Sequence, residues 1–169
     1  MKPVFLARCA FFSALMCICG WISIPLGNLS FTLQTFALFL ALLTLGGKGG
    51  TAAVTVFLTL GAVGLPVFSG FRGGIGALLG VTGGYLWGFL VACLVFWLIT
   101  GIYGARAKIP AVLTAILSVY VCGTVWFMVY APSGFWFILA QSVLPYLIPD
   151  AIKIFLAFWI ARRLEKAWR

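Results

Sequence analysis

The sequence predicts an all-α integral membrane protein built from six transmembrane helices in one domain. Hydrophobic residues make up 64% of the 169-residue chain and charged residues only 8%, whereas soluble domains carry about 25% charged residues. At about 20 residues per membrane span plus connections, six apolar stretches can be cut from the chain. No room remains for a soluble catalytic or ATPase domain, so residues 1–169 are expected to form a single membrane domain.

The first predicted helix covers residues 4–24. Lys2 and Arg8 surround the start of this apolar run, as they would in a signal peptide. No small-x-small cleavage pattern follows, so the segment is expected to remain as a membrane helix. The other predicted spans lie near residues 33–46, 51–67, 82–103, 109–131 and 147–164.

The connections between these spans differ in composition. Residues 46–50, Gly-Gly-Lys-Gly-Gly, are expected to form a tight cytoplasmic turn; they are not a phosphate-binding loop, since Gly49 stands where that motif requires Ser or Thr. Residues 25–35 are polar and uncharged. Seven glycines fall within residues 70–85 and predict an outer, re-entrant loop, because glycine weakens helices and exposes backbone. The aromatic segment 131–145 predicts an interfacial helix along the outer surface.

Basic residues are distributed very unevenly over the predicted topology. With six spans and both termini on one side, the opposite side receives only Arg72. The positive-inside rule therefore predicts that both termini are cytoplasmic. The net charge of +9 is explained by this topology, and a nucleic-acid partner is not expected. The basic residues on the side of the termini are Lys2, Arg8, Lys48, Arg106, Lys108, Arg162, Arg163, Lys166 and Arg169.

The last predicted helix contains the only charges embedded in an apolar span, Asp150 and Lys153. At a spacing of three residues both project from one helix face, and each would cost roughly 2.5 to 3.5 kcal/mol at the bilayer centre. They should therefore face a ligand or cavity, or pin the helix to a neighbour as a mutual ion pair. Pro149 is expected in the first turn of this helix, which would put Asp150 near its positive N-terminus.

The polar groups predicted on the outer half of the membrane indicate one outward-facing binding pocket. Most enzymatic alternatives are excluded, because the chain has no histidine and only two acidic residues. Metal sites, carboxylate pairs and Ser-His-Asp chemistry are thus unavailable. The five cysteines form no C-x-x-C pair and are interpreted as small apolar residues.

The first helix carries a stripe of small side chains at Ala7, Ala10, Ala14 and Cys17. Such a stripe allows close approach of another helix. It predicts either packing within this chain or a docking face for a separate membrane subunit.

Several segments taken together resemble the BioY family of biotin transporters, the substrate-binding (S) components of energy-coupling factor (ECF) transporters. They occur in order over most of the chain: Pro25 followed by residues 31–35 (Phe-Thr-Leu-Gln-Thr), 64–68 (Gly-Leu-Pro-Val-Phe), 80–89 (Gly-Val-Thr-Gly-Gly-Tyr-Leu-Trp-Gly-Phe) and 144–153 (Leu-Pro-Tyr-Leu-Ile-Pro-Asp-Ala-Ile-Lys). The resemblance implies a non-enzymatic, multi-pass protein of a bacterial-type cytoplasmic (inner) membrane, with biotin as its ligand and no cofactor. It also implies that a membrane T subunit and two ATPase subunits energise transport, and that the Ala10-x-x-x-Ala14 face docks on the T subunit.

Biotin offers ureido N–H donors, a ureido oxygen, an apolar bicycle and a carboxylate. Asp150 is expected to accept a ureido N–H and Lys153 to pair with the carboxylate. Alternatively, Lys153 donates to the ureido oxygen while Arg72 holds the carboxylate. Further candidate contacts, for which helix packing or loop solvation is the alternative, are Gln34, Ser69, Thr82 and Tyr85.

Two other functions stay open at this point. An S component for thiamin or riboflavin would share the architecture, although cationic thiamin is opposed by Lys153 and Arg72. A membrane transferase or structural subunit without a small ligand is disfavoured by the missing catalytic groups.

Overall fold

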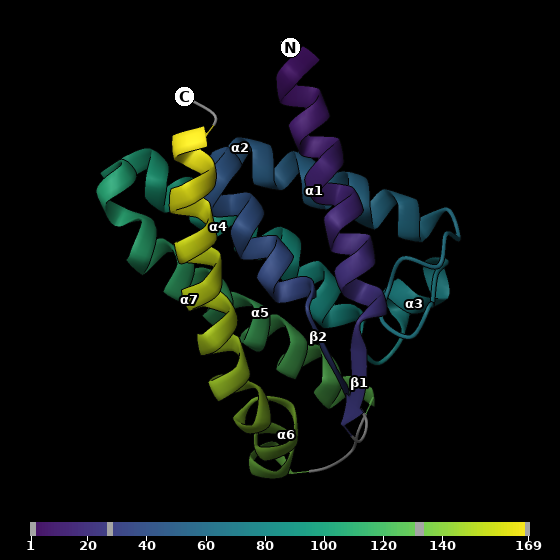
Figure 1. The fold of residues 1–169 in the computed structure, drawn as a ribbon. Coiled ribbons are helices and arrows are strands. Elements are labelled where there is room, and N and C mark those ends of the chain that lie inside the picture. The colour runs from purple at the N-terminus through teal and green to yellow at the C-terminus, as the bar shows by residue number, and fades with distance from the viewer. Residues whose placement is uncertain (1–2, 27–28, 131–133, 168–169) are drawn as a thin grey trace.

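The computed structural model describes residues 3–26, 29–130 and 134–167, which form a bundle of helices (Figure 1). Lys2, Arg169 and parts of the predicted 25–35 and 131–145 connections lie outside the described residues. The two ends of the chain lie at one end of the bundle, and a short hairpin and a short helix lie at the other. The long helices are α1 (Pro3–Trp21), α2 (Gln34–Ala62), α4 (Gly83–Tyr103), α5 (Lys108–Tyr130) and α7 (Leu144–Ala167).

Within the described part of the chain, five helical stretches are long and apolar enough to cross a membrane. One of them, α2, has 29 residues and is broken at Gly46, where φ is 73° and ψ is 179°. A positive φ is readily adopted only by glycine, so a single residue turns the chain between two helical arms. With the two arms counted separately, these described residues contain the six long helical segments of the predicted fold class.

The break in α2 is tighter than the turn predicted for residues 46–50. The second arm starts directly after Gly46, and it ends at Ala62, five residues before the predicted end. Gly64, with a φ of 108°, and Pro66 stop the helix there, because proline cannot continue it. Lys108 Nζ donates to Leu43 O at 3.3 Å, which places a cation at the carbonyl end of the first arm, where the helix dipole favours it.

A two-stranded antiparallel hairpin follows α1, and it was not predicted from the sequence. Strand β1 (Ser23–Leu26) pairs with β2 (Leu29–Thr32), with Ser23 opposite Thr32. The predicted helix 4–24 therefore ends early, at Trp21. Ile24 precedes Pro25, and a residue before proline is pushed toward extended backbone.

Shorter elements occupy the other connections. Helix α3 (Ile75–Leu79) lies within the predicted glycine-rich loop, and the 3₁₀ turn η1 (Ala105–Ala107) joins α4 to α5. Helix α6 (Phe135–Ser142) occupies the segment predicted as an interfacial helix.

The prediction that Pro149 and Asp150 stand at the N-terminus of the last helix is wrong. Helix α7 starts at Leu144, and Pro149 lies inside it. Pro145 instead occupies the first turn, where its missing N–H costs nothing. Asp150 lies beyond the first turn, outside the short reach of the helix dipole, and is stabilised by side-chain hydrogen bonds.

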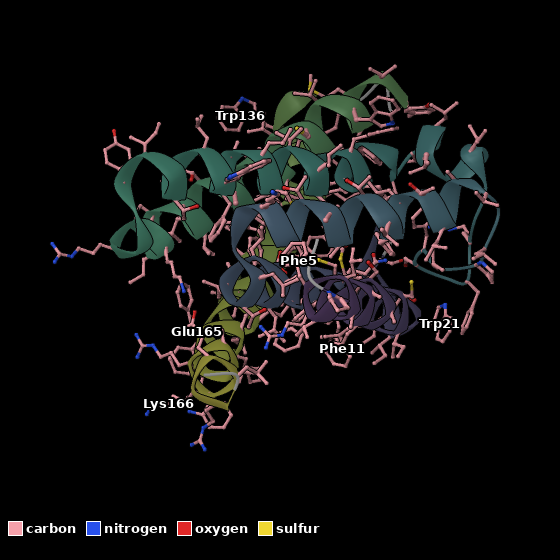
Figure 2. The ribbon with its side chains drawn as sticks, turned by 90° about the horizontal axis from the view of Figure 1, so that it is seen from above. Phe5, Phe11, Trp21, Trp136, Glu165 and Lys166 are labelled. Atoms are coloured by element: carbon pink, nitrogen blue, oxygen red, sulfur yellow. The ribbon has the colours of Figure 1, made fainter. Side chains whose placement is uncertain are left out.

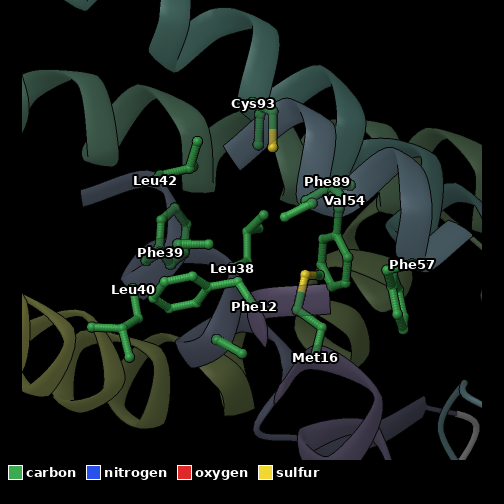
Figure 3. Close-up of a cluster of buried hydrophobic side chains, with 14 of the residues drawn as sticks. Phe12, Met16, Leu38, Phe39, Leu40, Leu42, Val54, Phe57, Phe89 and Cys93 are labelled. Atoms are coloured by element: carbon green, nitrogen blue, oxygen red, sulfur yellow. The ribbon is translucent and has the colours of Figure 1, made fainter. Parts of the chain in front are cut away.

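The core is formed where α2 meets its neighbours (Figure 3). Helix α1 packs along α2, α2 also packs against α4 and α7, and α4 packs along α5. Large apolar residues elsewhere face outward, such as Phe11 on the outer side of α1 (Figure 2), as expected for helices surrounded by lipid. The buried side chains drawn in Figure 3 include Phe12, Met16, Leu38, Phe39, Leu42, Val54, Phe57, Phe89 and Cys93.

Candidate ligand-binding site

A cavity lies among the start of α2, the helices α4, α5 and α7, strand β2 and the loop before α3. These segments are far apart in the sequence, and the bundle brings their polar side chains to one place. Every ligand contact predicted from the sequence lines this cavity: Gln34, Ser69, Arg72, Thr82, Tyr85, Asp150 and Lys153.

Asp150 is buried, and both acceptor positions of one of its carboxylate oxygens are occupied. Its Oδ1 accepts from Thr35 Oγ1 at 3.0 Å and from Lys153 Nζ at 2.8 Å. Its Oδ2 accepts from the Tyr120 hydroxyl at 2.6 Å. A carboxylate offers about four lone-pair positions, so these bonds leave one acceptor position on Oδ2.

Lys153 is buried next to it and uses all three of its ammonium hydrogens within the protein. Besides Asp150, Nζ donates to Thr32 O at 2.7 Å and to Thr35 Oγ1 at 3.1 Å. The ammonium also lies 3.9 Å from the centroid of the Phe31 ring, where a cation is attracted to the face of the ring.

The mutual ion pair predicted from the sequence is therefore present, and it lies within α7. The hydrogen bonds of its two residues to Thr32 and Thr35 tie α7 to strand β2 and to the first turn of α2. The same two side chains line the cavity. The ion-pair and cavity interpretations are thus compatible, because the pair forms part of the cavity wall.

Three buried polar atoms lack a hydrogen-bond partner among the described residues: Gln34 Nε2, Ser69 Oγ and Tyr146 Oη. Leaving a buried polar group unpaired costs about 1–3 kcal/mol. All three residues line the cavity. Their grouping at one cavity is the pattern expected of a site that a polar ligand completes.

Arg72 stands at the exposed edge of the cavity. Its Nε–H donates to Ser69 O at 3.1 Å, and a short antiparallel bridge with Phe68 shapes the loop around it. Both acidic residues of the chain pair with lysines, Asp150 with Lys153 and Glu165 with Lys108. Arg72 therefore has no ion-pair partner in the described ranges, and it supplies positive charge to the cavity.

Tyr85 crosses from α4 toward α5 and α6. Its ring lies against Gly123, where any added Cβ would collide with it, and its hydroxyl donates to Ser142 O at 3.4 Å. Apolar side chains of Phe68, Leu86 and Phe89 cover other parts of the wall. The cavity thus combines polar ends with an apolar middle, as ligand pockets commonly do.

Several residues of this wall were not predicted from the sequence. Tyr120 and Thr35 bond Asp150 directly, and Ser142 and Tyr146 line the cavity. A tyrosine within the predicted span 109–131 was a usable signal for Tyr120. Ser142 and Tyr146 gave none, because the segment before Pro149 was interpreted as a surface connection.

The predicted docking residues lie on the surface. Ala7, Ala10 and Ala14 are exposed along α1, whereas Cys17 is buried in the core. The alanine face (Ala7, Ala10 and Ala14) therefore turns away from the rest of the chain.

Comparisons with known proteins agree with this architecture. The BioY family model matches residues 1–169. The chain is 38% identical over 161 residues to "Biotin transporter BioY" of Thermotoga maritima, covering 95% of each chain. It is 37% identical over 165 residues to "Probable biotin transporter BioY" of Pyrococcus horikoshii, covering 98% of each.

A solved structure has the same fold. It is the S-component for biotin from an ECF-type ABC transporter, with a TM-score of 0.87 and 30% sequence identity over 98% of this chain and 92% of that one. The family resemblance inferred from the motifs is confirmed. This chain is a multi-pass membrane protein and belongs to the BioY family.

Proposed function

We propose that this protein binds biotin with high affinity and takes it up across the cytoplasmic membrane as the S component of an ECF-type transporter. Family membership supports this function. The observation that carries it is the cavity that joins the Asp150–Lys153 pair to three unpaired polar atoms.

Asp150 Oδ2 accepts one ureido N–H of biotin in this proposal. Its remaining acceptor position suits a single N–H, since Tyr120 already occupies the other position on this oxygen. The ureido oxygen accepts from Gln34 Nε2, which has hydrogens to donate and lies next to Thr35 in the chain. Lys153 fixes the carboxylate of Asp150 in place.

Arg72 holds the valerate carboxylate, together with the hydroxyl of Ser69. The role of Arg72 is the one that the sequence allowed as an alternative, and charge supports it. The charge of Lys153 is compensated by Asp150 at 2.8 Å, whereas both carboxylates of the chain are already engaged away from Arg72. The apolar bicycle then lies against Phe68, Leu86 and Phe89.

Transport requires partners that supply energy, and we assign these to a membrane T subunit and two ATPase subunits. The exposed alanine face of α1 is the proposed docking surface for the T subunit, because small residues permit close helix approach. The membrane is a bacterial-type cytoplasmic (inner) membrane.

Calorimetry of the purified protein with biotin, thiamin and riboflavin tests the ligand. We expect saturable binding of biotin alone, near nanomolar, about −12 kcal/mol. Tighter binding of thiamin or riboflavin would assign the cavity to that vitamin instead. Failure to bind any of the three would indicate a membrane subunit without a small ligand.

A further inference from the structure

A second hollow, the α5–α7 groove, lies between the outer sides of α5 and α7. It is lined mainly by apolar side chains that recur along one face of each helix, among them Ile109, Leu113 and Ile116 of α5 and Ile154, Phe155 and Phe158 of α7. Helices α5 and α7 make little contact with one another, because α5 packs on α4 and α7 packs on α2. The two helices therefore flank the groove without closing it.

The groove is at least as long as one leaflet of a bilayer. Its lining runs from Ile109 to Tyr120 on α5 and from Leu147 to Arg162 on α7, or about 16 Å and about 22 Å at 1.5 Å per residue. One leaflet contributes about half of the roughly 30 Å hydrocarbon thickness. A single acyl chain fits this length.

One end of the groove is strongly basic. Arg162 lines the groove and also two adjoining hollows, one shared with Arg106 and Lys108 and one shared with Arg163 and Lys166. Glu165, the only acidic residue here, is paired with Lys108 at 2.5 Å. Arg163 lies over the Trp159 ring, 4.5 Å from its centroid. An apolar channel that ends in several cations is complementary to a lipid with an anionic head.

We propose that the α5–α7 groove binds one anionic phospholipid. One acyl chain lies along the apolar lining, and the phosphate meets Arg162 and Arg106 at the end where the chain termini lie. Lipid chains are as apolar as the groove, so the apolar contact alone selects no particular lipid. The cations select the head group, each contributing about fivefold in affinity.

The far end of the groove reaches the back of the ligand cavity. Tyr120 and Asp150 line both hollows, so the end of the acyl chain would lie against the wall that their hydrogen bond forms. The bound lipid would thus support that wall from the membrane side.

Native mass spectrometry of the delipidated protein tests this site, with dioleoyl phosphatidylglycerol and dioleoyl phosphatidylcholine as probes. We expect one phosphatidylglycerol to be retained with at least tenfold preference, and Arg162→Gln to weaken its binding about fivefold. Lys48→Gln is the matched control, because Lys48 is exposed and does not line the groove. Equal retention of the two lipids, or an equal loss in Lys48→Gln, would overturn the proposal.

Blocking the groove gives an independent readout. Ala151 is exposed and lines the groove, whereas its neighbour Ile152 is exposed outside it. Ala151→Trp should abolish the retained lipid and Ile152→Trp should preserve it. Retention in both variants would refute an acyl chain in the groove. Displacement of the retained lipid by inorganic phosphate alone would overturn the lipid assignment and leave a site for free anions. Efficient crosslinking between copies through Leu113→Cys in native membranes would assign the groove to a second copy of this chain.

Discussion

The hydroxyl of Tyr120 donates to Asp150 Oδ2 at 2.6 Å, and this bond joins α5 to α7 between two hollows. On one side lies the ligand cavity, and on the other lies the α5–α7 groove. Because α5 and α7 make little other contact, this bond is a principal link between the two helices at that depth. It also determines which lone pairs of Asp150 stay available to a ligand.

Tyr120→Phe should weaken biotin binding about tenfold. A hydrogen bond to a charged group contributes about 1.5–3 kcal/mol, and part of this energy is lost in the free protein as well as in the complex. Calorimetry measures this change. Tyr103→Phe is the control, because Tyr103 is exposed at the end of α4 and lines neither hollow. Unchanged affinity in Tyr120→Phe would show that the bond does not position Asp150 for the ligand.

Asp150→Asn should lower biotin affinity by about 1.5–3 kcal/mol, or 10- to 150-fold, and also lower the melting temperature. The stability loss arises because the change strands the buried ammonium of Lys153, and breaking a buried pair costs about 3–5 kcal/mol. Lys153→Met should lower the melting temperature for the same reason.

The double variant Asp150→Asn/Lys153→Met separates the structural role of this pair from ligand binding. It should recover thermal stability while biotin affinity stays low, since no charge is left unpaired but the ligand acceptor is changed. Recovery of biotin affinity together with stability would refute the assignment of Asp150 as a ligand contact.

Arg72→Gln should weaken biotin more than it weakens biotin amide, which lacks the carboxylate. The reason is that the guanidinium is expected to contact the carboxylate and no other part of biotin. Titration of both compounds against this variant and against Lys153→Met decides which cation does so. Equal losses for the two compounds in Arg72→Gln, with selective loss in Lys153→Met, would reinstate Lys153 as the carboxylate partner.

Ala10→Trp and Ala14→Trp should each abolish cellular uptake while leaving biotin binding to the isolated protein intact. Added bulk prevents close helix approach at the exposed alanine face, and neither residue lines the ligand cavity. Phe11→Trp is the control, because Phe11 is already large and exposed on the same helix. Normal uptake in both alanine variants would mean that docking uses another surface.

Both termini should face the cytoplasm, since the basic residues concentrate on the side of the predicted topology where the termini lie. In a cysteine-free background, Gly76→Cys should react with an impermeant thiol reagent in intact cells, and Lys166→Cys should not. Both positions are exposed, and an added Cβ at Gly76 would meet nothing within 4 Å. Labelling at position 166 alone would invert the predicted topology.

The helical membrane fold and part of the cavity wall could be predicted from the sequence alone, and the reasons are physical. Buried charges in an apolar span are costly, so Asp150 and Lys153 were conspicuous, and the loops rich in glycine or polar residues marked the rest. The spacing of three residues predicted the bond between Lys153 and Asp150, but local patterns could not reveal that Lys153 also donates to Thr32 O and Thr35 Oγ1. Those two bonds join residues more than a hundred positions apart, and only the packed bundle brings them together.

Two of the wrong predictions concern prolines, which can either begin an element or lie within it. Pro149 was placed in the first turn of α7, whereas Pro145 occupies that turn and Pro149 is tolerated within the helix. Pro25 was interpreted as loop, whereas it belongs to β1 of the hairpin. A proline has no backbone N–H to donate, and it restricts the backbone of the residue before it. Tertiary packing decides which of several nearby prolines begins or ends an element.

The single-residue break of α2 at Gly46 restricts how the length of this chain can change. One residue inserted after Gly46 would rotate the second arm by about 100° and shift it by about 1.5 Å. Ala53, Val54 and Phe57, now fully buried, would then turn toward lipid. Insertions and deletions among natural variants should therefore be rare around Gly46 and frequent in the loops at the opposite end of the bundle.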